Sequence, residues 1–367
     1  GFPVIEHADY GKEVVTYDHN KTDVAIRLGS IFNMGRTVDK SRVALDIESL
    51  AMHTFIVGAT GSGKSNTIYK ILEELLSTRR DSFSFLVIEP AKGEYKRIFG
   101  HKKGVHVFGT NPQYTQLLRI NPFAFPDGVH ILEHVDRLVE IFNVCWPMYA
   151  AMPAVLKDAI LASYESTGWD LTLSSNIVSK HFFPTFSDLL EQLTRVINNS
   201  AYSEEVKANY IGSLTTRVKS LTNGINGQIF SSDEIDNSLL FDSNVIVDLS
   251  RVGSQETKSL IMGILIMRLS EYRMTHSNGS NQKLRHVTVL EEAHNILKAS
   301  THPSTQDGGD LAGKSVEMLS NAIAEMRTYG EGFIIADQSP NAVDISAIRN
   351  TNTKIIMRLP DITDREL

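Results

Sequence analysis

The glycine-rich run at residues 58–65 constrains the fold of this chain more than any other stretch. It matches the pattern G-x-x-x-x-G-K-[ST] at every fixed position, and its residues are Gly58, Ala59, Thr60, Gly61, Ser62, Gly63, Lys64 and Ser65. Residues 53–57 before it are mostly apolar and β-branched, and residues 66–77 after it carry apolar side chains at helical spacing. Strand, glycine loop and helix therefore follow in the order that predicts a nucleotide-binding loop rather than an accidental turn.

This pattern predicts ATP as the ligand, together with Mg²⁺. Glycines let main-chain N–H groups turn toward phosphate oxygens, and the N-terminus of the following helix adds partial positive charge. We expect Lys64 to reach the β- and γ-phosphates and the hydroxyl of Ser65 to ligate Mg²⁺. The residues expected to contact the nucleotide are Gly58, Thr60, Gly61, Ser62, Gly63, Lys64, Ser65 and Asn66.

The composition is typical of a soluble globular chain, because 42% of its 367 residues are hydrophobic and 22% are charged. A net charge of −7 argues against a chain coated in basic surface, although a ring could still hold nucleic acid in a narrow channel. The single cysteine, Cys145, cannot form an internal disulfide, which fits a reducing cytoplasm. Neither a secretory signal nor a membrane-spanning apolar run is visible, so we expect a cytoplasmic protein with no membrane partner. The start at Gly1 suggests a segment of a longer protein.

Hydrophobic periodicity divides the chain into four stretches. Residues 1–50 hold short alternating pieces, which we interpret as a β-rich N-terminal segment and part of a β-barrel. Residues 51–125 and 226–367 alternate buried strands with helices, so we expect an α/β P-loop core in two parts. Residues 126–225 repeat apolar side chains at i, i+3 and i+4, which predicts an all-helical insertion between them.

An acidic pair, Glu291 and Glu292, follows the apolar run at residues 286–290. Hydrolysis of ATP needs an acidic group in the shell of Mg²⁺ and a carboxylate that polarises the attacking water. We assign Glu291 to the metal shell and Glu292 to the water. The alternative is that both residues only cap the helix that follows, where negative charge is favourable.

Two further strands end in polar residues. The strand at residues 332–336 is followed by Asp337 and Gln338, whose amide could sense the γ-phosphate or the water, or could make an ordinary hydrogen bond at the strand end. The strand at residues 83–88 ends at Glu89. Because nucleotide sites form at the carboxyl edge of parallel sheets, these side chains could face the site.

Five stretches occur in a fixed order along most of the chain, about residues 51–367. They are residues 53–67 with the phosphate loop, Gly93-Glu94-Tyr95, the acidic run from Glu291 to Asn295, Gly330 before a strand that ends in Asp337-Gln338-Ser339-Pro340, and the tail from Asn352 to Leu359. Together these stretches resemble the HerA family of bacterial and archaeal DNA translocases. The phosphate loop alone is unspecific, whereas the ordered set is fairly specific.

The resemblance implies a RecA-like sheet of the additional-strand class, a helical insertion, an N-terminal β-barrel and a hexameric ring around double-stranded DNA. It also implies a partner nuclease or another effector, in DNA end resection or antiphage defence. In this family Gln338 would couple the nucleotide state to the sheet. An arginine from a neighbouring subunit would complete the site, and the candidates are Arg327 and, slightly favoured, Arg358.

The chain departs from the family pattern at two places. Glu291 stands where an aspartate is usual, and the longer side chain could shift the metal shell or weaken hydrolysis. The β-rich segment over residues 1–50 is also short for a complete barrel.

Two other classes of protein fit part of this pattern. A superfamily-two helicase would need a second RecA-like domain, and the about 75 residues after Glu292 leave no room for one. The alternative that stays open is a nucleotide-dependent scaffold, which assembles and regulates an effector without translocating DNA.

Overall fold

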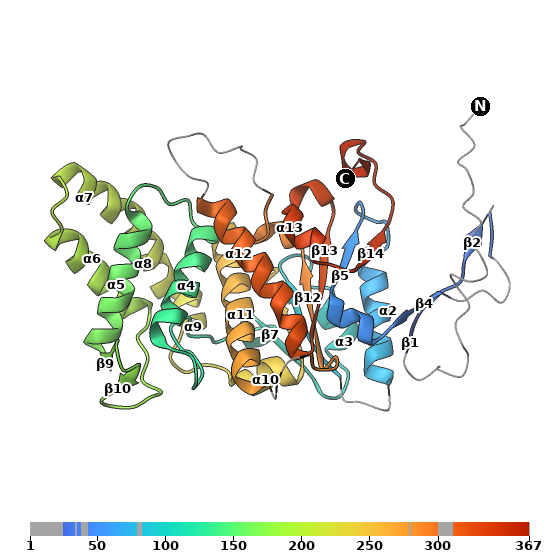
Figure 1. Ribbon diagram of the computed structural model, residues 1–367, viewed down its shortest axis with the longest axis horizontal. Coiled ribbons are helices and arrows are strands. Elements are labelled where there is room, and N and C mark those ends of the chain that lie inside the picture. Colours follow the sequence, from blue (N-terminus) through green and yellow to red (C-terminus); the bar gives the residue numbers. More distant parts are fainter. Residues whose placement is uncertain are drawn as a thin grey trace.

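The centre of the molecule is an eight-stranded sheet in which all neighbouring strands are parallel (Figure 1). The computed structural model describes residues 25–33, 35–37, 43–78, 83–277, 279, 281–299 and 311–366. The strand order is β14-β5-β13-β12-β6-β11-β7-β8. In chain order the strands are β5 (Thr54–Val57), β6 (Ser84–Glu89), β7 (Val105–Gly109), β8 (Gln116–Leu117), β11 (Asn244–Asp248), β12 (His286–Glu291), β13 (Glu331–Asp337) and β14 (Thr353–Ile356).

The central strands are continuous apolar runs because helices cover both of their faces. Every residue of β5, β6, β12 and β13 is buried. Successive side chains of a strand point to opposite faces, so Phe55 and Val57 join one hydrophobic cluster and Ile56 joins the other. The fold is therefore a three-layer α/β architecture of the predicted P-loop type.

Strand β13 lies between the phosphate-loop strand β5 and the acidic strand β12. This order confirms the expected additional-strand arrangement. The register pairs Asp337 with Val57 on one side, and Ala336 with Glu291 on the other. The phosphate loop, the acidic pair and Gln338 consequently leave the sheet at one edge.

One face of the sheet is covered by α2 (Lys64–Ser77) and α3 (Tyr95–Phe99), whose apolar side chains share a cluster with the strands. The other face is covered by α10 (Asn237–Asp242), α11 (Gln255–His276), α12 (Leu311–Met326) and α13 (Ile345–Arg349). Helix α11 is buried on almost all sides, because it lies between the sheet, α12 and the inserted helices.

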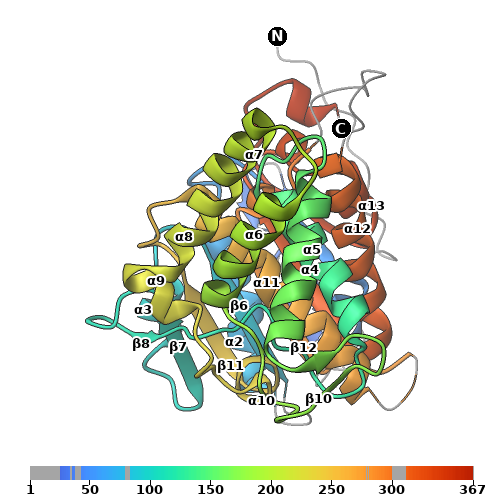
Figure 2. The ribbon, with the colours of Figure 1, turned by 90° about the vertical axis from the view of Figure 1, so that its left-hand side faces the viewer.

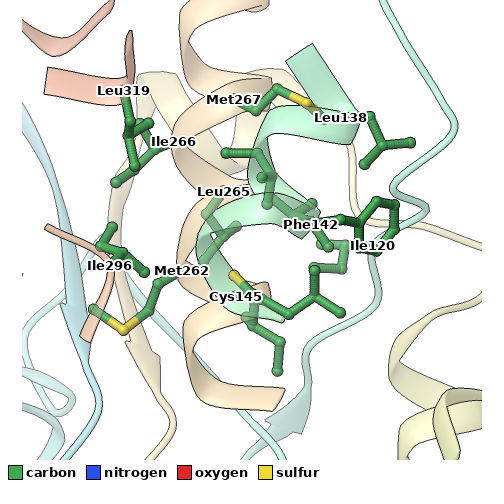
Figure 3. Packing of buried hydrophobic residues seen from close by; sticks show 14 of the residues in the cluster. Ile120, Leu138, Phe142, Cys145, Met262, Leu265, Ile266, Met267, Ile296 and Leu319 are labelled. Atoms are coloured by element: carbon green, nitrogen blue, oxygen red, sulfur yellow. The ribbon is translucent and has the colours of Figure 1, made fainter. Parts of the chain in front are cut away.

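Helix α4 (Ile131–Cys145) packs directly on α11 and joins the inserted helices to the core. Figure 3 shows Leu138, Phe142 and Cys145 of α4 in one hydrophobic cluster with Met262, Leu265 and Met267 of α11. Cys145 is buried, and burial raises the pKa of its thiol, which agrees with a packing role and not with a nucleophile.

The insertion is almost entirely helical and forms one end of the molecule (Figure 1), which Figure 2 views from outside. After α4 its helices are α5 (Met152–Ser166), α6 (Phe186–Asn199), α7 (Glu204–Tyr210), α8 (Thr216–Thr222) and α9 (Gly224–Ile229). A π-helical turn, Ile211–Thr215, joins α7 to α8. The sequence did not predict the small hairpin of β9 (Trp169–Asp170) and β10 (Ser175–Asn176) in this region.

The described part of the N-terminal segment is β-rich, as predicted. Strand β1 (Ala25–Gly29) pairs antiparallel with β4 (Val43–Asp46), and β2 (Phe32–Asn33) pairs with β3 (Arg36–Thr37). The predicted strands before residue 25 lie outside the described residues. A 3-10 turn, Glu48–Met52, then leads into β5.

No helix in the described ranges has the length and apolarity needed to cross a bilayer.

Gly263 of α11 sits where α4 approaches most closely, and its replacement tests this packing. A Cβ at Gly263 would lie 2.7 Å from Cγ2 of Ile141. We expect Gly263→Ala to lower the free energy of unfolding by about 1–3 kcal/mol, because overpacking outweighs the better helix propensity of alanine. The measurement is chemical denaturation followed by circular dichroism.

Gly212 provides the matched control, since it is also helical and a Cβ there would meet no described atom within 4 Å. Gly212→Ala should leave the stability unchanged or raise it by up to about 1 kcal/mol. Equal effects of the two substitutions would contradict the close contact between α4 and α11.

Candidate active site

The phosphate loop connects the end of β5 to the start of α2 and uses its glycines for specific geometric reasons. Gly61 and Gly63 have φ angles of 75° and 105°, in the left-handed region that glycine adopts without strain. A Cβ on Gly58 would lie 2.7 Å from the Cβ of Met357, so the neighbouring chain segment excludes a larger residue. The first turn of α2 then presents its main-chain N–H groups to the loop.

Lys64 is the first residue of α2 and is 8% exposed. Its ammonium group donates to the main-chain oxygens of Gly58 and, at 3.4 Å, Ala59. Burial lowers the pKa of Lys64, while the charges of Glu292 and Glu291 act in the opposite direction. A buried cation enclosed by loop main chain fits a phosphate group, which would supply its counter-charge.

A small cavity lies beside the loop and carries the oxygen groups that Mg²⁺ prefers. It is lined by Ser65, Glu89, Ala91, Lys92, Glu94, Tyr95, Glu291 and Glu292. Both predicted metal ligands, Ser65 and Glu291, thus face one cavity. The donor set therefore fits a divalent cation next to bound phosphates.

Glu291 ends β12 and is 9% exposed. The hydroxyl of Tyr95 donates to its Oε1 at 2.6 Å. Burial raises the pKa of Glu291, whereas the hydrogen bond from Tyr95 lowers it. Tyr95 belongs to the Gly93-Glu94-Tyr95 stretch, and its hydroxyl gives the carboxylate of Glu291 a fixed partner.

Glu292 adopts a left-handed conformation, with φ 48° and ψ 54°, which is uncommon for a residue other than glycine. The turn separates the two acidic side chains. Nε2 of Gln338 donates to Oε1 of Glu292 at 2.8 Å, and Oγ1 of Thr60 donates to Oε1 of Gln338 at 2.9 Å. The alternative of helix capping gains no support, because the side chain of Glu292 makes no cap hydrogen bond to the short 3-10 turn Ala293–Asn295 within the described chain.

Gln338 thus links the phosphate loop to the acidic pair through its side-chain amide. The contact joins Thr60 to Glu292 and is compatible with both possibilities raised by the sequence. Sensing of a γ-phosphate by Gln338 stays a prediction.

The two candidate arginines lie at opposite edges of the sheet. The main-chain oxygen of Arg358 accepts a hydrogen bond from the N–H of Ala59 at 3.0 Å, so Arg358 lies beside the phosphate loop of its own chain. Arg327 precedes β13, at the amino-terminal edge, away from that loop. Both side chains are exposed.

The sequence did not single out His294, which the structure brings next to the acidic pair. Oδ2 of Asp337 accepts from both the main-chain N–H of His294, at 2.8 Å, and its Nδ1, at 2.9 Å. His294 stands in the acidic run and Asp337 at the end of a predicted strand. The motifs therefore included both residues but did not indicate that they contact each other.

A family model described as "Helicase HerA, central domain" matches residues 26–269, about two thirds of the chain. The chain is 24% identical over 349 residues to a DNA double-strand break repair helicase HerA of Saccharolobus solfataricus, covering 94% of this chain and 61% of the relative. It is also 24% identical to the HerA helicase of Sulfolobus acidocaldarius, covering 93% of this chain and 61% of the relative. The chain thus spans about three fifths of the length of these relatives.

Solved structures share the fold. VirB4 of Thermoanaerobacter pseudethanolicus superposes with a TM-score of 0.63 at 17% identity, over 91% of this chain and 84% of that one. The plasmid coupling protein TrwB, solved in complex with ADP and Mg²⁺, gives a TM-score of 0.55 at 12% identity, over 89% of this chain and 73% of that one. At these identities the likeness concerns the fold alone.

Glu89, at the end of β6, generates a prediction about pH. Burial raises the pKa of Glu89 from 4.5 to about 7, although the main-chain N–H groups of Glu94 and Tyr95 donate to its carboxylate. A raised pKa in the folded state means that the stability contributed by this group is lost as the pH rises from about 4.5 to about 7. In Glu89→Gln the fall in unfolding free energy between pH 5 and 8 should be smaller by about 1–3 kcal/mol.

The measurement is the unfolding free energy at several pH values, compared as a slope because glutamine also changes the hydrogen bonds. Glu317→Gln, on the exposed side of α12, is the matched control and should keep the slope of the unchanged protein. Identical slopes in all three proteins would contradict the raised pKa of Glu89.

Proposed function

This chain belongs to the family of the helicase HerA central domain and is a P-loop ATPase, and we propose that it works as the motor of a ring that moves double-stranded DNA. The observation that carries the proposal is the convergence of Lys64, Glu292 and Gln338 at one edge of the sheet. The fold shared with VirB4 and TrwB and the similarity to HerA repair helicases support it.

In the proposed reaction, the first turn of α2 and Lys64 bind the β- and γ-phosphates of ATP. Ser65 and Glu291 would hold Mg²⁺, which would supply positive charge against the phosphate oxygens. Glu292 polarises the attacking water. Because Nε2 of Gln338 donates to Oε1 of Glu292, this contact would hold the carboxylate while its other oxygen, Oε2, polarises the water.

We assign the arginine of the neighbouring subunit to Arg327. Its place at the amino-terminal edge leaves it far along β13 from its own phosphate loop, so it can act only on a nucleotide held by another copy. Arg358, which lies beside Ala59, would serve the nucleotide of its own chain. This reverses the slight preference for Arg358 based on the sequence, and it makes hydrolysis depend on ring assembly.

The ring, the DNA and the partner are further parts of the proposal. With a net charge of −7, DNA would have to be held by local basic residues that a hexamer repeats around its channel. We propose a partner nuclease or antiphage effector, and action in the cytoplasm, on the strength of the family alone.

The test of the motor is ATP hydrolysis with and without double-stranded DNA, measured together with the mass in solution. We expect a hexamer whose rate rises with DNA, and a loss of at least about a hundredfold in Glu292→Gln, because water is no longer polarised. The control Glu317→Gln should keep the full rate. A ring that hydrolyses ATP slowly and ignores DNA would instead identify a nucleotide-dependent scaffold.

Mixing two inactive variants tests the assignment of the arginine. Arg327→Ala and Glu292→Gln should each be inactive alone. In a mixed ring, a junction between two neighbouring subunits should hydrolyse ATP where the Arg327→Ala subunit supplies an intact Glu292 and the Glu292→Gln subunit supplies an intact Arg327. After subunit exchange, about a quarter of the junctions in an equal mixture should be active.

Arg358→Ala mixed with Glu292→Gln should recover nothing, because both groups would then belong to one chain. Arg349→Ala, an exposed residue of α13, is the control for loss of a surface charge and should keep full activity. Recovery with Arg358→Ala and none with Arg327→Ala would overturn the assignment.

A further inference from the structure

We propose that His294, held in place by Asp337, is a positioning residue that orients the Glu292 carboxylate for hydrolysis. The inference rests on the proposed role of Glu292 and adds a residue pair to that site. It is carried by a set of hydrogen bonds that joins the turn after β12 to the end of β13.

Asp337 is the centre of this set and is 2% exposed. Its Oδ2 accepts from the main-chain N–H of His294 at 2.8 Å and from Nδ1 of the same residue at 2.9 Å. Its Oδ1 accepts from the main-chain N–H of Gln338 at 2.7 Å. Because a carboxylate oxygen only accepts, Nδ1 of His294 must carry a hydrogen, and the ring is fixed in one orientation.

Each oxygen of Glu292 faces a group that Asp337 fixes. Oε1 accepts from Nε2 of Gln338 at 2.8 Å, and Oε2 lies 3.7 Å from Nδ1 of His294. The left-handed turn at Glu292, with φ 48°, directs its side chain into this position. Backbone strain of this kind persists only where surrounding contacts determine it. The contacts of Asp337 act here together with Nδ2 of Asn295, which donates to the main-chain oxygen of Glu292 at 2.6 Å.

The charges around the imidazole support the same role. The groups that face it are Asp337 on β13, and Glu292 and Lys298 on its own segment. The hydrogen bond to Asp337 raises the pKa of His294, burial opposes this, the charges of Asp337 and Glu292 raise it further, and Lys298 lowers it. A positive charge on His294 would lie 3.7 Å from Oε2 of Glu292 and would attract that oxygen toward the ring, which favours one orientation of the carboxylate.

The same three residues do not fit a metal site. Their ligand atoms lie within 4.8 Å of one another, a spacing that a cation could use. However, Oδ2 of Asp337 already accepts two N–H groups, one of them from Nδ1 of His294, so an ion bound to Nδ1 and Oδ2 would have to break this hydrogen bond. Positioning therefore explains the contacts, and coordination does not.

Kinetics of His294→Gln test the inference. We expect kcat to fall about tenfold with KM for ATP unchanged within about twofold, since a misdirected base affects the chemical step and not binding. The alkaline limb of the kcat–pH profile, where the unchanged protein loses the charge on His294, should disappear. His101→Gln, an exposed histidine after α3, is the control and should keep both kcat and profile.

In Asp337→Asn the same limb should move to lower pH, because His294 loses its carboxylate partner. An unchanged kcat and pH profile in His294→Gln would overturn the proposal, as would a rise in KM with kcat unaffected.

A second measurement does not depend on hydrolysis. With ¹³C-labelled histidine, the resonance that disappears in His294→Gln should titrate above the ordinary value of about 6.5 in the unchanged protein. The apparent pKa of His294 should fall in Glu292→Gln, because this substitution removes the negative charge 3.7 Å from Nδ1 of His294 and leaves Asp337 in place. A titration that ignores Glu292→Gln would overturn the contact, whereas an inactive protein that shows this shift would contradict the proposed motor alone.

Discussion

The pairing of β13 between β5 and β12 is the constraint on which the site depends. Parallel hydrogen bonding places Asp337 opposite Val57 and Ala336 opposite Glu291. A shift of one residue would send every side chain of β13 to the other face of the sheet. The register therefore decides that Gln338 meets the phosphate loop on one side and the acidic pair on the other.

The two adjacent acidic residues make different contacts because of how the chain turns between them. Glu291 still belongs to the strand and is buried against the hydroxyl of Tyr95. Glu292, one residue later, has a left-handed conformation and reaches the amide of Gln338. Burial raises the pKa of Glu291. The groups next to the carboxylate of Glu292 are Gln338, which follows β13, and His294, in its own turn. One turn of the backbone thus separates a carboxylate that contacts Tyr95 from one that contacts Gln338.

The helical end of the molecule is coupled to this edge through the long helix α11. Its N-terminal part contacts the turn after the acidic strand, since the hydroxyl of Ser259 donates to the main-chain oxygen of Asn295 at 2.7 Å. Farther along, α11 is enclosed between α4 and α12. A displacement of the acidic turn would therefore act on a tightly packed helix, and close-packed interiors transmit such strain well.

The sequence by itself determined most of the elements, although not the hairpin of β9 and β10. The glycine pattern, the apolar runs and the helical spacing predicted the phosphate loop, the α/β core, the helical region and the motif residues, because each is a local pattern of side chains along the chain. It could not place Tyr95 on Glu291, His294 on Asp337, or Arg327 and Arg358 at opposite edges. These contacts join residues far apart in the chain, and only the strand order and register of the folded sheet bring them together.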